Sequence, residues 1–210
     1  MSAQSDHPAV HDPTVLRAIA HPTRNRILGE LYARGHLRAA DVAAELDIPA
    51  NQASFHLRQL AKYGLIEPAP EHARDGRDRV WKLVDERGFD LNPRELREQP
   101  GGAAAVSVWH REAKAQAHAA VERAYRIDHP REVRVTISDD WVRLTKSEAG
   151  EYVEELLALQ EKWQRKGREA SAGETERRTY HLLQILQPAP GRGADTHVTD
   201  ESHDAGSADA

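Results

Sequence analysis

Residues 49–66 (PANQASFHLRQLAKYGLI) hold the side chains with the clearest chemistry in this chain. Amide, guanidinium, ammonium and aromatic groups recur there at helical spacing, at Asn51, Gln52, Phe55, Arg58, Gln59 and Lys62. The residues that fall on the opposite side of a helical wheel are apolar: Ala53, Leu57, Leu60 and Ala61. Asn and Gln can pair with adenine and Arg with guanine, whereas Lys mostly neutralises phosphate. The stretch therefore predicts an amphipathic helix whose polar face could reach DNA.

The same polar face would also suit an ordinary surface helix, so its neighbours decide between the two interpretations. Residues 37–48 predict a preceding helix, which Asp47 and Pro49 end. Strands are predicted at 65–67 and 79–84, on either side of a loop rich in Pro, Arg, Asp and Gly. Two helices joined by a short turn and followed by a two-stranded wing predict a winged helix-turn-helix unit, whose second helix enters the major groove.

Over residues 14–84 the sequence resembles the ArsR-type winged helix-turn-helix transcriptional regulators. The resemblance depends on HPTRNRIL at 21–28, on Ser54-x-His56-Leu57-x-x-Leu60 followed by Gly64-Leu65, and on Arg79-x-Trp81. It implies DNA binding, and its motif adds Ser54 and His56 to the predicted recognition helix. Metal-sensing members usually carry cysteines in the helix before the recognition helix, and this chain has 0 cysteines. The resemblance therefore leaves the signal open.

Arginines around the predicted wing and the first helices are candidates for contact with the DNA backbone. They are Arg74, Arg77 and Arg79 in and beside the wing, with Arg24 and Arg38 before the recognition helix. Arginine suits phosphate and the narrow minor groove. The alternatives are pairing of the wing arginines with Asp75 and Asp78 on a solvated loop, and an ordinary surface position for the other two.

Composition excludes several classes of function. The chain has 210 residues, 39% hydrophobic and 5% aromatic residues, and a mean hydropathy of −0.73, which predicts some unstructured sequence. The absence of cysteine excludes disulfides, thiolate metal sites and cysteine catalysis. No phosphate-binding glycine loop, H-E-x-x-H or G-x-S-x-G motif occurs, so an enzyme is not expected, nor is a cofactor. Without an apolar run of about 18 residues, we expect a cytoplasmic protein with no membrane contact.

The distribution of charge favours DNA binding by one part of the chain. The net charge is −5, which by itself argues against nucleic acid. Residues 14–84, however, hold 11 Lys and Arg against 8 Asp and Glu, a balance of +3. Affinity for DNA follows the phosphates that one face neutralises, so the local balance decides. We expect double-stranded DNA as the partner, with dimerisation and base contacts adding to a modest electrostatic attraction.

The segment after the wing predicts a dimerisation helix. Residues 85–100 read as a loop, and residues 103–125 read as an alanine-rich helix. The residues along one side of that helix are Val106, Trp109, Ala113, Ala117 and Ala120. Small residues permit close helix approach, and the resemblance implies pairing with the first helix, through Leu16 and Ile19, across a two-fold axis. A homodimer would read a palindromic site with half-sites about one turn apart.

A second stripe of the same helix raises the question of a metal site. It consists of His110, Lys114, His118 and Glu122 at steps of four. Lys114 lies between the two histidines, which would be about 12 Å apart along the axis. A solvated face is therefore favoured over a metal site.

Residues 129–187 predict a small strand-helix-strand subdomain. Alternation predicts strands near 133–137 and 141–145, and Thr145 with Glu148 forms a capping box for a helix to about Gly167. Residues 178–186 fit a strand or a helix, and a strand is favoured. Five aromatic residues could line a pocket for a small-molecule effector or could form the core of the subdomain, and the core is favoured. They are Trp109, Trp141, Tyr152, Trp163 and Tyr180.

The predicted fold is therefore a mainly helical α+β chain. Its parts are a disordered arm (1–12), a winged helix-turn-helix domain (13–84), a linker with a dimerisation helix (85–128), an α/β subdomain (129–187) and a disordered tail (188–210). The predicted function is sequence-specific transcriptional regulation, as a repressor, by a homodimer on a palindromic operator. The alternative is a protein-interaction module or ligand-sensing adaptor that does not read DNA.

Overall fold

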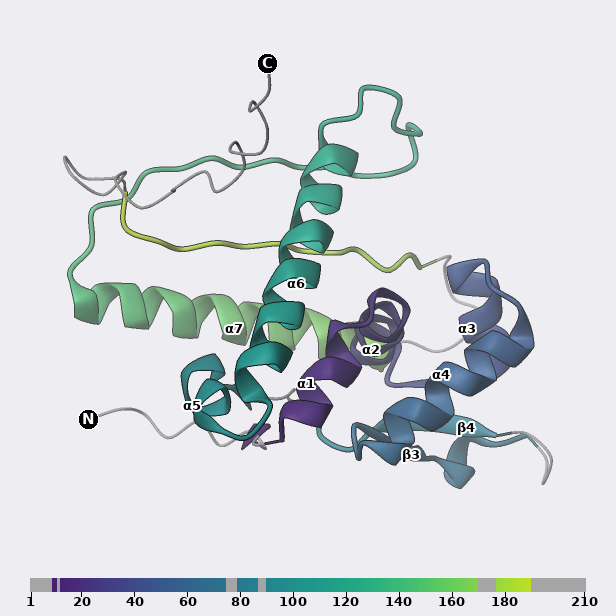
Figure 1. Ribbon diagram of the computed structural model, residues 1–210. Coiled ribbons are helices and arrows are strands. Elements are labelled where there is room, and N and C mark those ends of the chain that lie inside the picture. The colour runs from purple at the N-terminus through teal and green to yellow at the C-terminus, as the bar shows by residue number, and fades with distance from the viewer. Residues whose placement is uncertain (1–8, 11, 75–78, 87–89, 170–176, 190–210) are drawn as a thin grey trace, which may run out of the picture.

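The computed structural model of the chain describes residues 9–10, 12–74, 79–86, 90–169 and 177–189 (Figure 1). In this part of the chain the fold is mainly helical, with a small sheet near the N-terminus and long helices after it. The elements are β1 (Ala9–Val10), α1 (Pro13–Ala20), α2 (Pro22–Arg34), β2 (His36–Arg38), α3 (Ala39–Leu46), α4 (Ala50–Lys62), β3 (Ile66–Pro68), η1 (Pro70–His72), β4 (Val80–Leu83), β5 (Asp90–Leu91), α5 (Pro93–Glu98), α6 (Gly102–Ala124) and α7 (Lys146–Arg168).

Helices α2, α3 and α4 and a three-stranded antiparallel sheet form the winged helix-turn-helix unit. The strand order is β2-β4-β3, with Leu37 opposite Trp81 and Ile66 opposite Leu83. The predicted wing strands at 65–67 and 79–84 are confirmed as β3 and β4. The start of the predicted helix at 37–48 is wrong, because the first two of these residues belong to β2 and α3 begins at Ala39.

Local sequence signals set the boundaries of these helices. Pro13 and Pro22 occupy the first positions of α1 and α2, where a missing backbone N–H costs nothing. Gly35 ends α2 with a φ of 82°, a conformation that glycine adopts without strain. Asp47 ends α3 with a φ of 52°, in the left-handed region that Asp tolerates. The turn between α3 and α4 is therefore short, and it fixes where the second helix begins.

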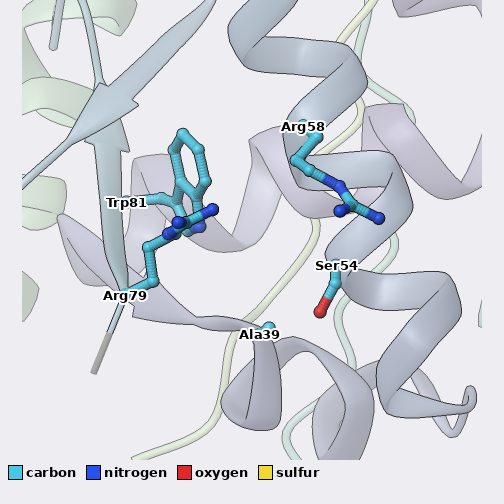
Figure 2. Close-up of a pocket in the computed structure, with 5 residues that line it drawn as sticks. All are labelled: Ala39, Ser54, Arg58, Arg79 and Trp81. Carbon is cyan, nitrogen blue, oxygen red and sulfur yellow. The ribbon is translucent and has the colours of Figure 1, made fainter. Parts of the chain in front are cut away.

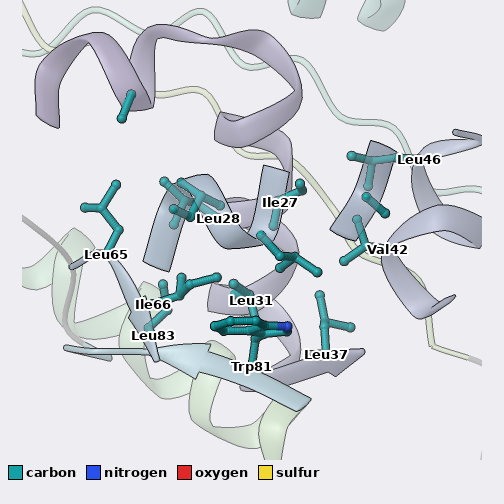
Figure 3. Close-up of a cluster of buried hydrophobic side chains, with 14 residues drawn as sticks. Ile27, Leu28, Leu31, Leu37, Val42, Leu46, Leu65, Ile66, Trp81 and Leu83 are labelled. Carbon is teal, nitrogen blue, oxygen red and sulfur yellow. The ribbon is translucent and has the colours of Figure 1, made fainter. Parts of the chain in front are cut away.

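A hydrophobic core holds α4 against α2, α3 and the sheet (Figure 3). Leu57 and Leu60 of α4 are fully buried, as are Ile27 and Leu31 of α2. Figure 3 shows the indole of Trp81 lying in the same cluster, on the sheet side. Burial of a leucine side chain stabilises a fold by about 1.5–3 kcal/mol, so this cluster determines which face of α4 points outward.

A second, smaller core lies between α1, α5 and α6. Its buried members are Leu16, Leu96, Ala105 and Val106, all of one chain. Gly102 starts α6 so close to α5 that a Cβ there would collide with the carbonyl oxygen of Leu96. The predicted loop at 85–100 is therefore wrong in part, because it contains β5 and α5.

The N-terminal arm also departs from the prediction of disorder. Residues 9–10 form β1, which pairs in parallel with β5. The carboxylate of Asp12 accepts a hydrogen bond of 2.7 Å from the backbone N–H of Thr14 and so caps α1. The remainder of the predicted arm, and residues 190–210 of the predicted tail, lie outside the described residues.

The predicted strands of the C-terminal half are absent from the described residues. Residues 133–145 and 177–189 contain no strand, although α7 and its capping box at Thr145 are confirmed. Trp141 is 78% exposed, Trp163 57% and Tyr180 50%, so these aromatic side chains do not form the predicted core. The alternating apolar pattern is present, but the two extended segments do not pair.

The last turn of α7 connects this half to the winged helix-turn-helix unit. Nη1 of Arg168 donates a 3.0 Å hydrogen bond to the carbonyl oxygen of Tyr32, near the end of α2. Nη2 of Arg168 lies 3.6 Å from a carboxylate oxygen of Glu86, beyond the wing. The hydroxyl of Thr179 donates a 2.8 Å hydrogen bond to Glu30.

Burial, with a smaller contribution from Asp85, raises the pKa of Tyr32 to about 12. In the described part of the chain, no helix is long and apolar enough to cross a membrane.

Candidate nucleic-acid interface

The outward face of α4 presents polar groups next to one aromatic ring. Asn51, Gln52, Phe55, Arg58 and Lys62 are exposed, and we call these five residues the recognition surface. Phe55 is 50% exposed, which is unusual for a phenylalanine on a small domain. Gln59 and Ser54 are half-buried at the edges of this surface. The helical spacing in the sequence therefore gave the correct orientation of the helix.

His56 is the member of the predicted DNA-binding set that the structure places elsewhere. Its side chain is 4% exposed and lies on the buried face of α4. Its ring centroid is 4.9 Å from that of His21, at the junction of α1 and α2. The prediction of a DNA contact by His56 is therefore wrong, because its ring packs inside the domain.

A hollow lies between α4 and the base of the wing (Figure 2). Ser54 and Arg58 line it from α4, Arg79 and Trp81 from the wing, and Ala39 from the start of α3. Figure 2 shows the guanidinium of Arg79 beside the indole of Trp81, and the side chain of Arg58 extending from the facing helix. Within the described residues, neither Arg58 nor Arg79 has a carboxylate partner. Two guanidinium groups that no described carboxylate neutralises make an attractive position for phosphate.

Arg38 is committed to a structural ion pair. Its Nη2 lies 2.8 Å and its Nε 3.0 Å from the two carboxylate oxygens of Asp41, and its backbone N–H donates a 2.9 Å hydrogen bond to the same group. These hydrogen bonds hold the pKa of Asp41 below its ordinary value, against the opposing effect of burial. The pair fixes the passage from β2 into α3, and the predicted phosphate contact of Arg38 stays a prediction.

Arg24 is also engaged within the domain. Its Nε donates a 2.6 Å hydrogen bond to the carbonyl oxygen of Ala18, and its Nη2 a 3.1 Å bond to that of Arg17. These acceptors are among the last carbonyls of α1, which have no partner within the helix. The guanidinium of Arg24 therefore caps α1, and its predicted phosphate contact stays a prediction.

The wing is stabilised by contacts that do not involve the recognition surface. Nζ of Lys82 lies 2.9 Å from Glu71 and 3.6 Å from Glu67, which raises the pKa of Lys82. His36 stacks on His72 with ring centroids 3.9 Å apart. Arg74 is exposed at the start of the wing loop, whereas Arg77 lies outside the described residues.

The predicted dimer residues have separate locations. Leu16 is 0% exposed and Val106 6%, in the core between α1 and α6 of one chain. The first helix and the long helix therefore pack together within one chain, and the role of these two residues at a dimer interface stays a prediction. Ile19 and Trp109 pack against the same core. The alanines at 113, 117 and 120 are half-buried. Among the described residues, which include His110 and His118, no group of three or more His, Asp or Glu side chains is placed so that it could hold a metal ion.

Two residues of the hollow were not among the predicted sites. Trp81 lies two residues after Arg79, and side chains two apart in a strand share a face, so the period of the strand could have placed both on the hollow. Ala39 has no chemistry of its own and lines the hollow by its position at the start of α3. No signal in the sequence marks it.

Comparison with known proteins agrees with this architecture. The family model of a helix-turn-helix domain matches residues 19–69. Residues 19–69 are a helix-turn-helix domain. They include α2, α3, α4 and β3, and they fall within the segment that resembles the ArsR-type regulators. This domain is a DNA-binding unit of transcription regulators.

The helix-turn-helix protein is also similar to solved structures at low identity. MarR from E. coli in its apo form is 14% identical with a TM-score of 0.31, over 70% of this chain and 87% of the MarR chain. ZitR from Lactococcus lactis in complex with DNA is 15% identical with a TM-score of 0.29, over 78% and 81%. AdcR from Streptococcus pyogenes is 14% identical with a TM-score of 0.29, over 66% and 78%. No curated protein sequence matches the chain.

Proposed function

We propose that the protein is a sequence-specific DNA-binding repressor that acts as a homodimer on a palindromic operator. The observation that supports it most is the pair of guanidinium groups, Arg58 on α4 and Arg79 at the wing, that face one hollow without a carboxylate partner in the described residues. In this proposal, Arg58, Asn51 and Gln52 read base edges in the major groove. Arg79, Arg74 and Lys62 neutralise phosphate and set the register.

A homodimer suits the modest charge of the DNA-binding part. A balance of +3 over residues 14–84 gives one domain few phosphate contacts, and a second domain doubles them on the same duplex. Two-fold symmetry of the protein then requires a palindromic site. A dimer that covers such a site within a promoter would exclude the polymerase, which is the basis for proposing repression.

The test is the selection of DNA fragments from the source genome, followed by measurement of affinity with Arg58→Ala. We expect the variant to lose about 1–3 kcal/mol at the selected site and to relax base preference at one position. Arg94→Ala is the matched control, because Arg94 is an exposed arginine on α5, outside the recognition surface. Equal affinity of Arg58→Ala and the wild type at the same salt concentration would remove Arg58 from the interface.

A second candidate function is a winged helix that binds protein instead of DNA. The exposed ring of Phe55, at the centre of the recognition surface, favours it. The two candidates differ in salt dependence. DNA binding by a dimer predicts that the logarithm of affinity falls steeply and linearly with the logarithm of salt concentration. A flat dependence, together with a larger effect of Phe55→Ala than of Arg58→Ala on partner capture, would favour the protein-binding function.

A further inference from the structure

In the described part of the chain, helix α7 has a long apolar stripe whose side chains are partly or largely exposed. The helix has 23 residues, and none of them is buried. At about 100° per residue the stripe consists of Tyr152, Val153, Leu156, Leu159 and Trp163. Tyr152 is 41% exposed and Trp163 57%. Helices in proteins owe most of their stability to the packing of an apolar face, so this stripe requires a partner surface.

The charges of α7 identify the kind of partner. Along one edge of the stripe, the N-terminal half carries Glu148, Glu151 and Glu155, and the C-terminal half carries Lys162 and Lys166. This order complements the helix dipole. In an antiparallel pair of identical helices the same order of charges also attracts the partner helix, because the acidic half of each helix then lies along the basic half of the other. In a parallel two-fold pair this edge would instead lie along the opposite edge of the partner's stripe, so these charges would not meet. The edge is therefore complementary to itself in one orientation.

We propose that α7 is a self-association surface and that its occupant is α7 of a second copy of this chain, packed antiparallel. The inference rests on the proposed homodimer and names a surface for it. A two-fold interface uses the same patch on both subunits, so a helix complementary to itself satisfies that requirement. The segment 177–189 lies beside α7, since Gln160 donates a hydrogen bond to Gln184, and the neighbouring Ile185 is exposed as well.

The placement of α7 connects this surface to DNA. Its last turn is fastened to the end of α2 through Arg168, as Figure 1 also shows by the position of α7 behind α2. An antiparallel pair therefore puts the two helix-turn-helix domains at opposite ends of a rod. A helix of 23 residues is about 35 Å long. Half-sites on one face of a duplex are about 34–36 Å apart, so the rod has the length that a palindrome with half-sites one turn apart requires.

Charge reversal tests the pairing in the full-length protein. One variant carries Glu151→Lys with Glu155→Lys, and a second carries Lys162→Glu with Lys166→Glu. A third carries all four changes, which keeps the net charge at −5 and keeps the edge complementary to itself. Sedimentation velocity gives the mass of each variant alone and of 1:1 mixtures. Far-ultraviolet circular dichroism confirms that each one is folded.

The proposal predicts that the first two variants self-associate about tenfold more weakly than the wild type or worse, and that mixing them restores the dimer. The third variant is expected to form its own dimer and to exclude the wild type. The proposal would be overturned if the third variant formed mixed dimers freely with the wild type. It would also be overturned if the first two variants, each measured alone, dimerised as tightly as the wild type. If the wild type remains a dimer that selects DNA while α7 variants have no effect, the proposed function stands and the α7 pairing is lost. If the wild type is monomeric and selects no DNA, both the proposed function and the α7 pairing are contradicted.

Discussion

His21 and His56 form a buried contact between the junction of α1 with α2 and the DNA-binding helix α4. Their rings are 4.9 Å apart, and Nδ1 of each is buried without a hydrogen-bond partner in the described residues. Burial lowers the pKa of both imidazoles, and the charge of Arg24 lowers each further. For His56 the neighbouring His21 adds to the effect, and for His21 Glu112 opposes it. The folded domain therefore holds this pair neutral at neutral pH.

This pair predicts that the domain loses stability as the pH falls. A histidine whose pKa is lowered by folding binds protons more readily in the unfolded chain, so stability is full above the ordinary pKa of 6.5 and declines below it. His36, whose pKa is lowered by burial and by His72, acts in the same direction. Urea unfolding at pH 7.5 and 5.5 measures the decline. His56→Gln is expected to reduce it, whereas the exposed control His110→Gln is not. An equal decline in both variants would contradict the prediction.

Arg24 gives a second prediction at this scale. Its two hydrogen bonds to carbonyl oxygens of α1 join α2 to the end of α1. Bonds from a charged donor contribute about 1.5–3 kcal/mol, so Arg24→Ala is expected to lower the free energy of unfolding by about that amount. Arg26→Ala is the matched control, because Arg26 is an exposed arginine two residues along the same helix. Loss of DNA affinity at unchanged stability would instead return Arg24 to the set of phosphate contacts.

At the scale of elements, α7 depends on its N-terminal cap more than a buried helix would. The hydroxyl of Thr145 accepts a 3.3 Å hydrogen bond from the backbone N–H of Glu148, and the backbone N–H of Thr145 donates a 2.7 Å bond to the Glu148 carboxylate. Because α7 buries no residue in one chain, Thr145→Ala should increase amide hydrogen exchange in its first turns by about fivefold. Ser147→Ala, one step inside the helix, is the control. Unchanged exchange after Thr145→Ala would mean that packing, not the cap, holds this end.

The helices were more predictable than the strands because their signals are local. Pro13, Pro22 and Gly35 mark boundaries through their own backbone chemistry, and apolar spacing gave the buried face of α4. A strand needs a partner, which the alternation of residues does not name. The three residues of β2 pair with β4, more than 40 positions away, and the last two of them fall within the predicted helix. In the described chain the alternating residues of 133–145 and 178–186 form no strand pairing.

The part of the candidate site that lies on the single helix α4 could be predicted from the sequence, because helical spacing shows which residues share a face. The wheel of α4 gave Asn51, Gln52, Arg58 and Lys62 correctly as outward residues, and the same wheel puts His56 near the apolar stripe. His56 entered the predicted set through the family motif, which does not state a direction. The capping role of Arg24 was not predicted, because its acceptors are backbone carbonyls of a neighbouring helix, and the sequence does not show which helix end lies within reach of a long side chain.

For the whole molecule, the spacing of the two DNA-binding domains is the property that the proposals require. A symmetric dimer with a rigid connection binds both half-sites at once, which multiplies their affinities, provided that they lie on one face of the duplex. Insertion of about five base pairs between half-sites turns one of them to the opposite face. Affinity for such a site should fall by about 100-fold, toward that of a single half-site.

The length of the insertion separates a rigid connection from a flexible one. Insertion of about ten base pairs returns the half-sites to one face but moves them about 34 Å further apart. A dimer held by paired α7 helices spans one separation, because Arg168 fastens each helix to its own DNA-binding domain, so this site should bind as weakly as the first. Titration of the three duplexes at one salt concentration measures both effects. If affinity recovers for the duplex with ten inserted base pairs, the connection between the two domains must be able to extend. That result would contradict a fixed rod between the domains, but it would still agree with binding of a symmetric dimer to both half-sites.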